Sequence, residues 1–151
     1  MSEASHAGDR ADGQSHRRFL AIAAATAAVA VLLLGLDLVW LGVVAKGLYD
    51  RALGPLLREP VHWPAALGFY GFYVGAIVAT AVATARSVRV AAARGAALGL
   101  IVYASYELTN LAVIAGWPAS LVPVDVAWGV ALTGSVSAGG AWVKLRVMDR
   151  R

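Results

Sequence analysis

Three acidic side chains stand inside apolar stretches of the chain. Asp37, Glu107 and Asp125 are each flanked by runs of apolar residues. An ionisable group in hydrocarbon costs about 2.5 to 3.5 kcal/mol on insertion scales, so it persists mainly where it has a partner or a function. Asn110 follows Glu107 by three residues and shares its helix face, so its amide can join the same network. We take these four residues as candidate substrate- or proton-binding residues, and no catalytic residue can be assigned.

The three carboxylates need a positive partner. Like charges at short range, and burial itself, disfavour full ionisation of all three. The candidates are a proton, an oxygen-preferring metal ion such as Mg²⁺ or Ca²⁺, an organic amine, or Lys46 and Arg51 folding in from the first loop. We assign neither a metal site nor a cofactor, because no ligand motif for either is present.

The composition places these residues in a bilayer. Of the 151 residues, 60% are hydrophobic and 15% are charged, a balance that a soluble domain of this size could hardly cover with polar surface. The basic residues flank apolar runs instead of covering one face, so nucleic acid is not an expected partner. The absence of cysteine excludes disulfides, thiolate metal sites and thiol redox chemistry.

Four apolar segments must position the polar residues. Each is long enough to cross a membrane as a helix. The predicted fold is therefore all-α, an integral membrane four-helix antiparallel bundle over residues 19–146, between a disordered cytoplasmic tail (1–18) and a basic C-terminal tail (147–151). The predicted helices are residues 19–44, 64–85, 95–115 and 121–145. A short amphipathic helix is expected in the first loop.

The distribution of Lys and Arg predicts the orientation. The N-terminal tail, the second loop and the C-terminus hold ten of these residues, whereas the first and third loops hold three. Because cytoplasmic segments carry the excess of Lys and Arg, both termini are predicted to be cytoplasmic. The chain is thus predicted to be a multi-pass protein of the cell inner (plasma) membrane.

This topology brings the acids to one level. Asp37 lies seven residues before the outer end of the first predicted helix, Glu107 eight before that of the third, and Asp125 four residues into the fourth. At about 1.5 Å per residue these positions are roughly 6 to 12 Å below the outer surface. The expected neighbours of this polar layer are Tyr70, Tyr103, Trp40 and Trp128.

A short motif occurs in both the first and the fourth segment. Asp37-Leu-Val-Trp40 recurs as Asp125-Val-Ala-Trp128, and a glycine follows each copy closely. The repetition favours pairing of the two helices, and an inverted repeat of the transporter kind would explain it. We expect Gly42, which follows the first copy, to let another helix approach closely.

Each feature also has a structural interpretation. Glu107 and Asn110 can hold helices together through hydrogen bonds, which for Asn110 alone is the better explanation. The tryptophans fit an aromatic belt at the membrane interface. Three acids in a bundle this small favour a functional site over a purely structural network.

The signatures together resemble a known family. They are Leu36-Asp37-Leu-Val-Trp40-Leu-Gly42, then Tyr106-Glu107-Leu-Thr-Asn110-Leu, Trp117-Pro118 and Asp125-Val-Ala-Trp128-Gly129. From Phe19 onward the chain resembles a bacterial family of small four-helix inner-membrane proteins classed as a domain of unknown function, whose members commonly carry aspartate at the position of Glu107. The resemblance implies the fold and the membrane location but no activity.

Three functions stay open. The first is proton-coupled transport of a cationic or lipid-like substrate, by a homo-oligomer because four helices enclose little volume. The second is a membrane enzyme or accessory subunit acting on lipid head groups, with the acids as general acid and base or as ligands of a divalent ion. The third is a structural or assembly protein of the lipid bilayer. Ser-His-Asp chemistry is excluded because the serines lack a histidine base inside the helices.

Overall fold

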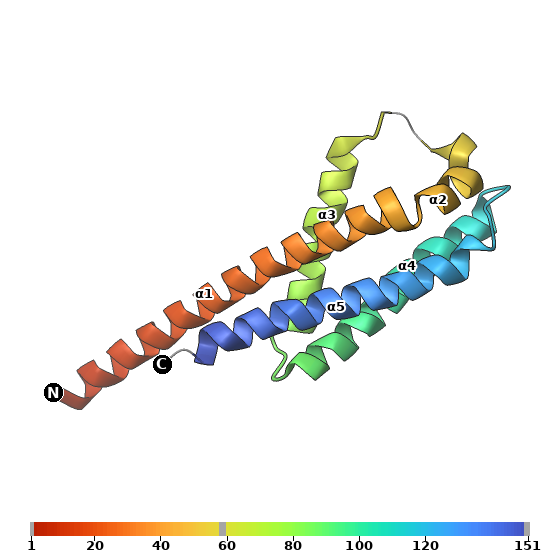
Figure 1. Cartoon of the computed structure of the whole chain (residues 1–151). Helices are drawn as coiled ribbons and strands as arrows, with labels where there is room; N and C mark the ends of the chain where they lie inside the picture. Colours follow the sequence, from red (N-terminus) through yellow and green to blue (C-terminus); the bar gives the residue numbers. More distant parts are fainter. Residues whose placement is uncertain (1, 58–59, 150–151) are drawn as a thin grey trace.

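The computed structural model describes residues 2–57 and 60–149, which form helices joined by turns (Figure 1). Two of the helices, α1 and α3, end in π-helical segments, and a 3₁₀ turn at Gly54–Leu56 follows α2. The elements are α1 (Ser2–Val39) with its π-helical end Trp40–Val44, α2 (Lys46–Leu53), α3 (Trp63–Ile77) with its π-helical end Val78–Val82, α4 (Val88–Val113) and α5 (Leu121–Asp149).

Four stretches of the described chain are long and apolar enough to cross a membrane. They are Gly13–Val44, Trp63–Val82, Val88–Val113 and Leu121–Asp149. The predicted all-α membrane fold with four spans is thereby confirmed. The two chain ends lie at the same end of the bundle (Figure 1).

Two helix starts differ from those predicted. α1 begins at Ser2, so the backbone of residues 2–18 is helical where a disordered tail is predicted; adding a residue to an existing helix gains a hydrogen bond without a new nucleation cost. α4 begins at Val88, seven residues before the predicted start, because the Ser87 side chain caps it by accepting a hydrogen bond from the Val90 N–H at 3.3 Å. Arg89 and Arg94 therefore belong to α4 and not to a loop.

Small residues set the distance between α4 and α5. A Cβ atom added to Gly99 of α4 would lie 2.7 Å from the carbonyl carbon of Gly129 in α5, so the two backbones are in contact there. Gly95, one turn earlier, faces Ser137 and Thr133 as closely. This is the small-xxx-small packing that membrane helices use. Gly42 differs from the expectation, since no atom lies within 4 Å of a Cβ added there.

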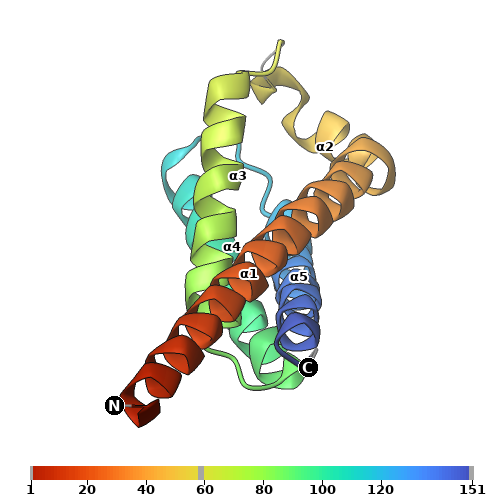
Figure 2. The ribbon, with the colours of Figure 1, turned by 90° about the vertical axis from the view of Figure 1, so that its left-hand side faces the viewer.

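α3 is packed at only one of its ends. Its main contacts are with α1, whereas its π-helical end packs against α4 and α5. The buried hydroxyl of Tyr73 is 2.6 Å from the Thr133 hydroxyl of α5, near this packed end. Towards its N-terminus α3 rises away from α4 and α5 (Figures 1 and 2). The bundle is therefore closed near the termini and splayed at the other end.

Lys144 closes the packed end. Its side chain is buried, and its ammonium donates to the carbonyl oxygens of Val82 at 2.7 Å, Ala83 at 3.1 Å and Ala85 at 2.6 Å. These carbonyls lie at the end of the second span, where the last turn of a helix lacks its usual N–H donors, although the Val82 carbonyl also accepts from the Ala85 N–H at 3.2 Å. Lys144, which the sequence analysis counts among the basic residues of the C-terminus, thus caps a neighbouring helix.

Candidate functional site

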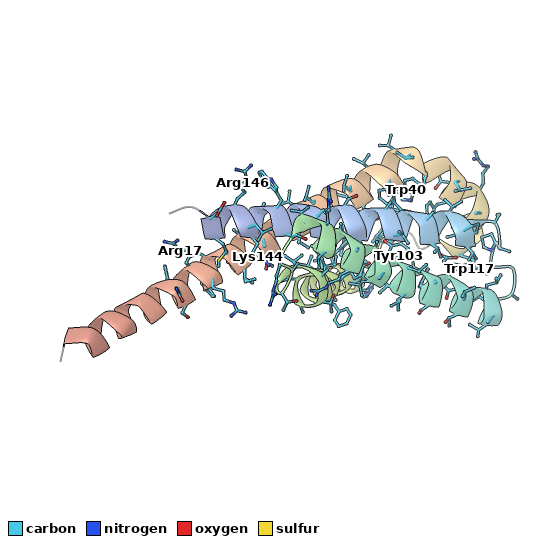
Figure 3. The ribbon with its side chains drawn as sticks, turned by 90° about the horizontal axis from the view of Figure 1, so that it is seen from below. Arg17, Trp40, Tyr103, Trp117, Lys144 and Arg146 are labelled. Carbon is cyan, nitrogen blue, oxygen red and sulfur yellow. The ribbon has the colours of Figure 1, made fainter. Side chains whose placement is uncertain are left out.

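The splayed half of the bundle contains a pocket of about 430 Å³. Six aromatic side chains and two carboxylates contribute to its lining, and within residues 2–57 and 60–149 no Lys, Arg or His lines it. All five helices contribute. The lining residues are Asp37, Leu41, Tyr49, Phe69, Tyr70, Val102, Tyr103, Tyr106, Asp125 and Trp128. Figure 3 shows Trp40, Tyr103 and Trp117 towards this end of the bundle, and Arg17, Lys144 and Arg146 towards the end that carries the termini.

Asp37 is held from two other helices. Its carboxylate is 7% exposed and accepts a hydrogen bond from the Tyr70 hydroxyl of α3 at 2.7 Å. The second carboxylate oxygen accepts from the indole N–H of Trp128 in α5 at 3.2 Å. The acid of α1 thus joins three spans, and it does so at the pocket wall.

Trp40 and Trp128 form a stacked pair. Their ring centroids are 4.3 Å apart and their planes differ by 6°. This contact realises the predicted pairing of the first and last spans, since each ring comes from one copy of the repeated motif. The indole nitrogen of Trp40 is buried and makes no hydrogen bond with any described residue. Trp40 also begins the π-helical end of α1, and such segments are frequent at functional sites.

Asp125 receives its donor from outside the four spans. The Tyr49 hydroxyl of α2 donates a hydrogen bond to the Asp125 carboxylate. Burial raises the pKa of Tyr49 above its usual value, and the hydrogen bond to Asp125 raises it further, so the hydroxyl keeps its proton as the donor. Sequence reasoning did not identify Tyr49. Its signal was weak, a lone tyrosine in a short segment of mixed polarity.

Glu107 lies behind the pocket wall. Its side chain is 0% exposed, and its Oε2 accepts a hydrogen bond from the Trp117 indole N–H at 3.0 Å. Its Oε1 has no hydrogen-bond partner among the described residues. The charge of Glu107 acts on the nearby Asp125 carboxyl of α5. Two buried carboxyl groups whose charges interact need a proton or another cation between them.

The three carboxyl groups bind different donors. Within the part of the chain that the structure describes, the hydrogen bonds of Asp37, Glu107 and Asp125 go to tyrosine and tryptophan side chains and not to one another. Within residues 2–57 and 60–149, no three His, Cys, Asp or Glu side chains are grouped so that they could hold a metal ion. The donor set therefore matches protons or an organic cation better than Mg²⁺ or Ca²⁺, which take six or more oxygen ligands or a near-ideal octahedron.

Three residues considered from the sequence lie elsewhere. Asn110 is partly buried outside the pocket lining and interacts with Tyr106 on its own helix. Lys46 forms a salt bridge with Asp50 at 2.6 Å on the exposed face of α2. The Arg51 guanidinium lies over Gly47 of the same helix. The residue of α2 that binds a pocket carboxylate is the aromatic Tyr49, which donates to Asp125.

Tyr103 depends on a glycine for its place in the pocket. A Cβ added to Gly129 would lie 2.8 Å from the Tyr103 Cβ and nearer still to two ring atoms. The Tyr103 side chain therefore lies against the backbone of α5 at Gly129, the residue after Trp128. Aromatic side chains and two carboxylates share the pocket lining, a combination that can attract a cation through cation–π interaction and charge.

Comparison with known proteins shows to which family the chain belongs. A family model described as "Predicted membrane protein (DUF2177)" matches residues 22–142, a range that contains every residue of the pocket lining. No curated protein and no solved structure matches the chain. The match confirms the resemblance to a membrane protein family of unknown function. The chain belongs to the DUF2177 family of predicted membrane proteins.

Proposed function

We propose that this integral membrane protein binds a small organic cation in the pocket of the splayed half and carries it across the bilayer in exchange for protons. The observation that supports the proposal is the pocket lining, which has six aromatic side chains, the carboxylates of Asp37 and Asp125, and no cationic residue among those the structure describes. Aromatic faces with nearby carboxylates attract ammonium groups, and the attraction is stronger where water is excluded.

The buried carboxyl pair supplies the coupling to protons. Asp125 contacts the ligand space on one side and interacts with the buried Glu107 on the other. A proton held by this pair and an organic cation beside Asp125 compete for the same negative charge. Binding of one therefore favours release of the other, which is the linkage an exchanger needs.

The proposal also covers the membrane location of the protein and its oligomeric state. The excess of Lys and Arg at the end carrying both termini supports cytoplasmic termini in an inner membrane, with the pocket in the outer half. It also includes a homo-oligomer. Gly68, Gly71 and Gly75 of α3 have no atom within 4 Å of an added Cβ, so α3 offers a small-residue face that another helix could approach.

An assembly role is the second candidate, because protein donors already serve each carboxylate. Asp37 binds Tyr70 and Trp128, Asp125 binds Tyr49, and Glu107 binds Trp117. A network of this kind locks helices together whether or not a ligand is present.

Ligand binding in nanodiscs separates the two candidates. Tetramethylammonium should quench or shift tryptophan fluorescence in the wild-type protein, and a dye in weak buffer should report protons released on binding. Asp37→Asn and Asp125→Asn should each weaken binding by about tenfold or more, the equivalent of about 1.4 kcal/mol. Asp50→Asn is the matched control, since Asp50 is an exposed carboxylate near the same end of the bundle.

Each outcome of the binding experiment supports or refutes one of the two candidate functions. Weaker binding by the two pocket variants with normal thermal stability supports the cation exchanger. Unchanged affinity and unchanged proton release in both variants would refute it. Loss of stability in both, with no binding by the wild-type protein, would favour the assembly role.

A further inference from the structure

The pocket has a side that no helix closes. Around it, α3 packs on α1, α1 on α5, and α5 on α4, which leaves the seam between α3 and α4. Near the termini this seam is closed, because the π-helical end of α3 packs against α4. In the splayed half, α3 has its main contacts with α1 instead, and the pocket lies there between lining residues of α3 and α4.

Two residues at this seam line the pocket and stay exposed. Phe69 of α3 and Tyr106 of α4 are lining residues, yet they are 45% and 57% exposed. Side chains that line a pocket and keep this much exposed area mark its mouth.

The mouth lies within the thickness of the bilayer. Phe69 is six residues from the start of α3, and Tyr106 is seven from the end of α4. At about 1.5 Å per residue both lie roughly 9 to 10 Å below the helix ends. That depth places the mouth beside lipid chains, and its rim is made of aromatic and aliphatic side chains.

The direct path from the outer water passes α2, which lies at that end of the bundle (Figure 1). The Tyr49 hydroxyl of α2 donates a hydrogen bond to Asp125. The turn after α4 places Trp117 over Glu107. A ligand arriving from water must displace the Tyr49 contact, whereas a ligand arriving from the bilayer meets the open seam.

We propose that the ligand of this pocket is an amphiphilic cation. Its ammonium group lies between Asp37 and Asp125 among the aromatic faces, and its apolar tail leaves between α3 and α4 into the bilayer. The inference rests on the proposed function for the cationic head and adds the tail and the lateral route. The charge of the two carboxylates is the reason to expect a cationic head group. The exposed apolar rim is the reason to expect an apolar tail.

A pair of cations with and without a tail tests the inference. Dodecyltrimethylammonium and tetramethylammonium share a head group, and dodecyl sulfate controls for the chain alone. Because the long-chain cation concentrates in the bilayer, its dissociation constant must be expressed as a mole fraction of lipid. We expect saturable binding of dodecyltrimethylammonium, weakened about tenfold or more by Asp37→Asn, and no saturable binding of dodecyl sulfate.

A bulky residue at the seam tests the route. Val102→Trp, on the α4 side of the pocket, should weaken dodecyltrimethylammonium more than tetramethylammonium, changing the ratio of their dissociation constants by about tenfold. Leu100→Trp is the control, since Leu100 is 48% exposed on the same helix and is not part of the lining. An unchanged ratio in Val102→Trp would overturn the lateral route.

Spin labels give a measurement that needs no bulky variant. The chain has no cysteine, so Phe69→Cys carries a single label at the mouth, and Phe72→Cys carries one on an exposed part of the same helix outside the lining. Both labels should be reached by oxygen more than by a water-soluble nickel chelate. Only the label at 69 should be immobilised by dodecyltrimethylammonium.

The failures of the two proposals are distinguishable. If tetramethylammonium binds with dependence on Asp37 but the long-chain cation does not compete for the site, the proposed function stands and the amphiphile inference is wrong. If neither cation binds the wild-type protein, the proposed function itself is wrong. A label at 69 that the nickel chelate reaches better than oxygen would place the mouth in water and also overturn the inference.

Discussion

Gly129→Ala probes the contact that positions Tyr103. The new Cβ would lie 2.8 Å from the Tyr103 Cβ and nearer still to the Cγ and Cδ2 of its ring. These atoms are at the root of the side chain, so they cannot swing away without moving the ring or the helix. Gly134→Ala, on the same helix, places its Cβ 3.4 Å from Ala92 and Ala96 atoms, an ordinary contact.

The comparison isolates the cost of overpacking. Both variants gain the same preference of alanine over glycine inside a helix, about 1 kcal/mol, so this gain cancels between them. Overpacking a close contact costs typically about 1 to 3 kcal/mol. The free energy of unfolding of Gly129→Ala should therefore be lower than that of Gly134→Ala by about 1 to 3 kcal/mol.

Reversible unfolding in mixed micelles with increasing dodecyl sulfate, followed by circular dichroism, measures this difference. Tetramethylammonium affinity should fall in Gly129→Ala because the displaced Tyr103 ring changes the pocket wall. Equal unfolding free energies in the two variants would refute the packing argument. A destabilised Gly129→Ala variant with wild-type affinity would show that the position of Tyr103 does not matter for binding.

Three further substitutions address single contacts. Tyr49→Phe removes the hydrogen-bond donor to Asp125, so amide hydrogen exchange in α2 should accelerate by about tenfold. Unchanged exchange would show that this hydrogen bond does not hold α2 against the bundle. Trp117→Phe removes the N–H that binds Glu107 and should lower the unfolding free energy by about 1 to 3 kcal/mol, whereas Trp63→Phe, at an exposed ring, should leave it nearly unchanged. Lys144→Met leaves the carbonyls of Val82 and Ala85 without their ammonium donor, so the free energy of unfolding should fall by a similar amount in the same titration. Arg146→Met, at an exposed residue of the same helix, is the control. Equal stability of the two variants would show that water replaces the ammonium.

The spans could be predicted because hydrocarbon leaves the backbone few choices. A run of about twenty apolar residues has to form a helix in a bilayer, so four such runs predict four helices. The start of α4 could not be placed in this way. Arg89 and Arg94 read as a basic loop, but the Ser87 cap begins the helix before them, and Arg94 donates to the Thr84 hydroxyl at 2.9 Å.

The candidate site was only partly predictable. Helix rise alone brings Asp37 and Asp125 to one level, and the structure places both at the pocket. Asn110 was expected to join Glu107 on one helix face, and the buried positions of α4 are Ala91, Gly95, Gly99 and Glu107, at spacings of four and eight residues. Asn110 is only partly buried and interacts with Tyr106 of its own helix, a choice of partner that helix spacing alone does not predict.

The contacts that the connecting segments make with the acids could not be predicted from the sequence. Tyr49 and Trp117 bind the acids from outside the four spans, and no periodicity marks them. The separation of α3 from α4 and α5 could not be predicted either, for another reason. Its glycines match a packing motif, but only the structure shows that Gly68 and Gly71 have no neighbour within 4 Å of an added Cβ.

The cap formed by Lys144 has a consequence for biogenesis. The carbonyls of Val82, Ala83 and Ala85 are made early in synthesis, and their donor is residue 144 of 151. A nascent chain that has inserted only its first three spans lacks that ammonium, so the end of its second span must rely on water or lipid head groups. Helix α5, which is made after the first three spans, thus completes the second span, and a chain that terminates before Lys144 leaves this end of the bundle unfinished.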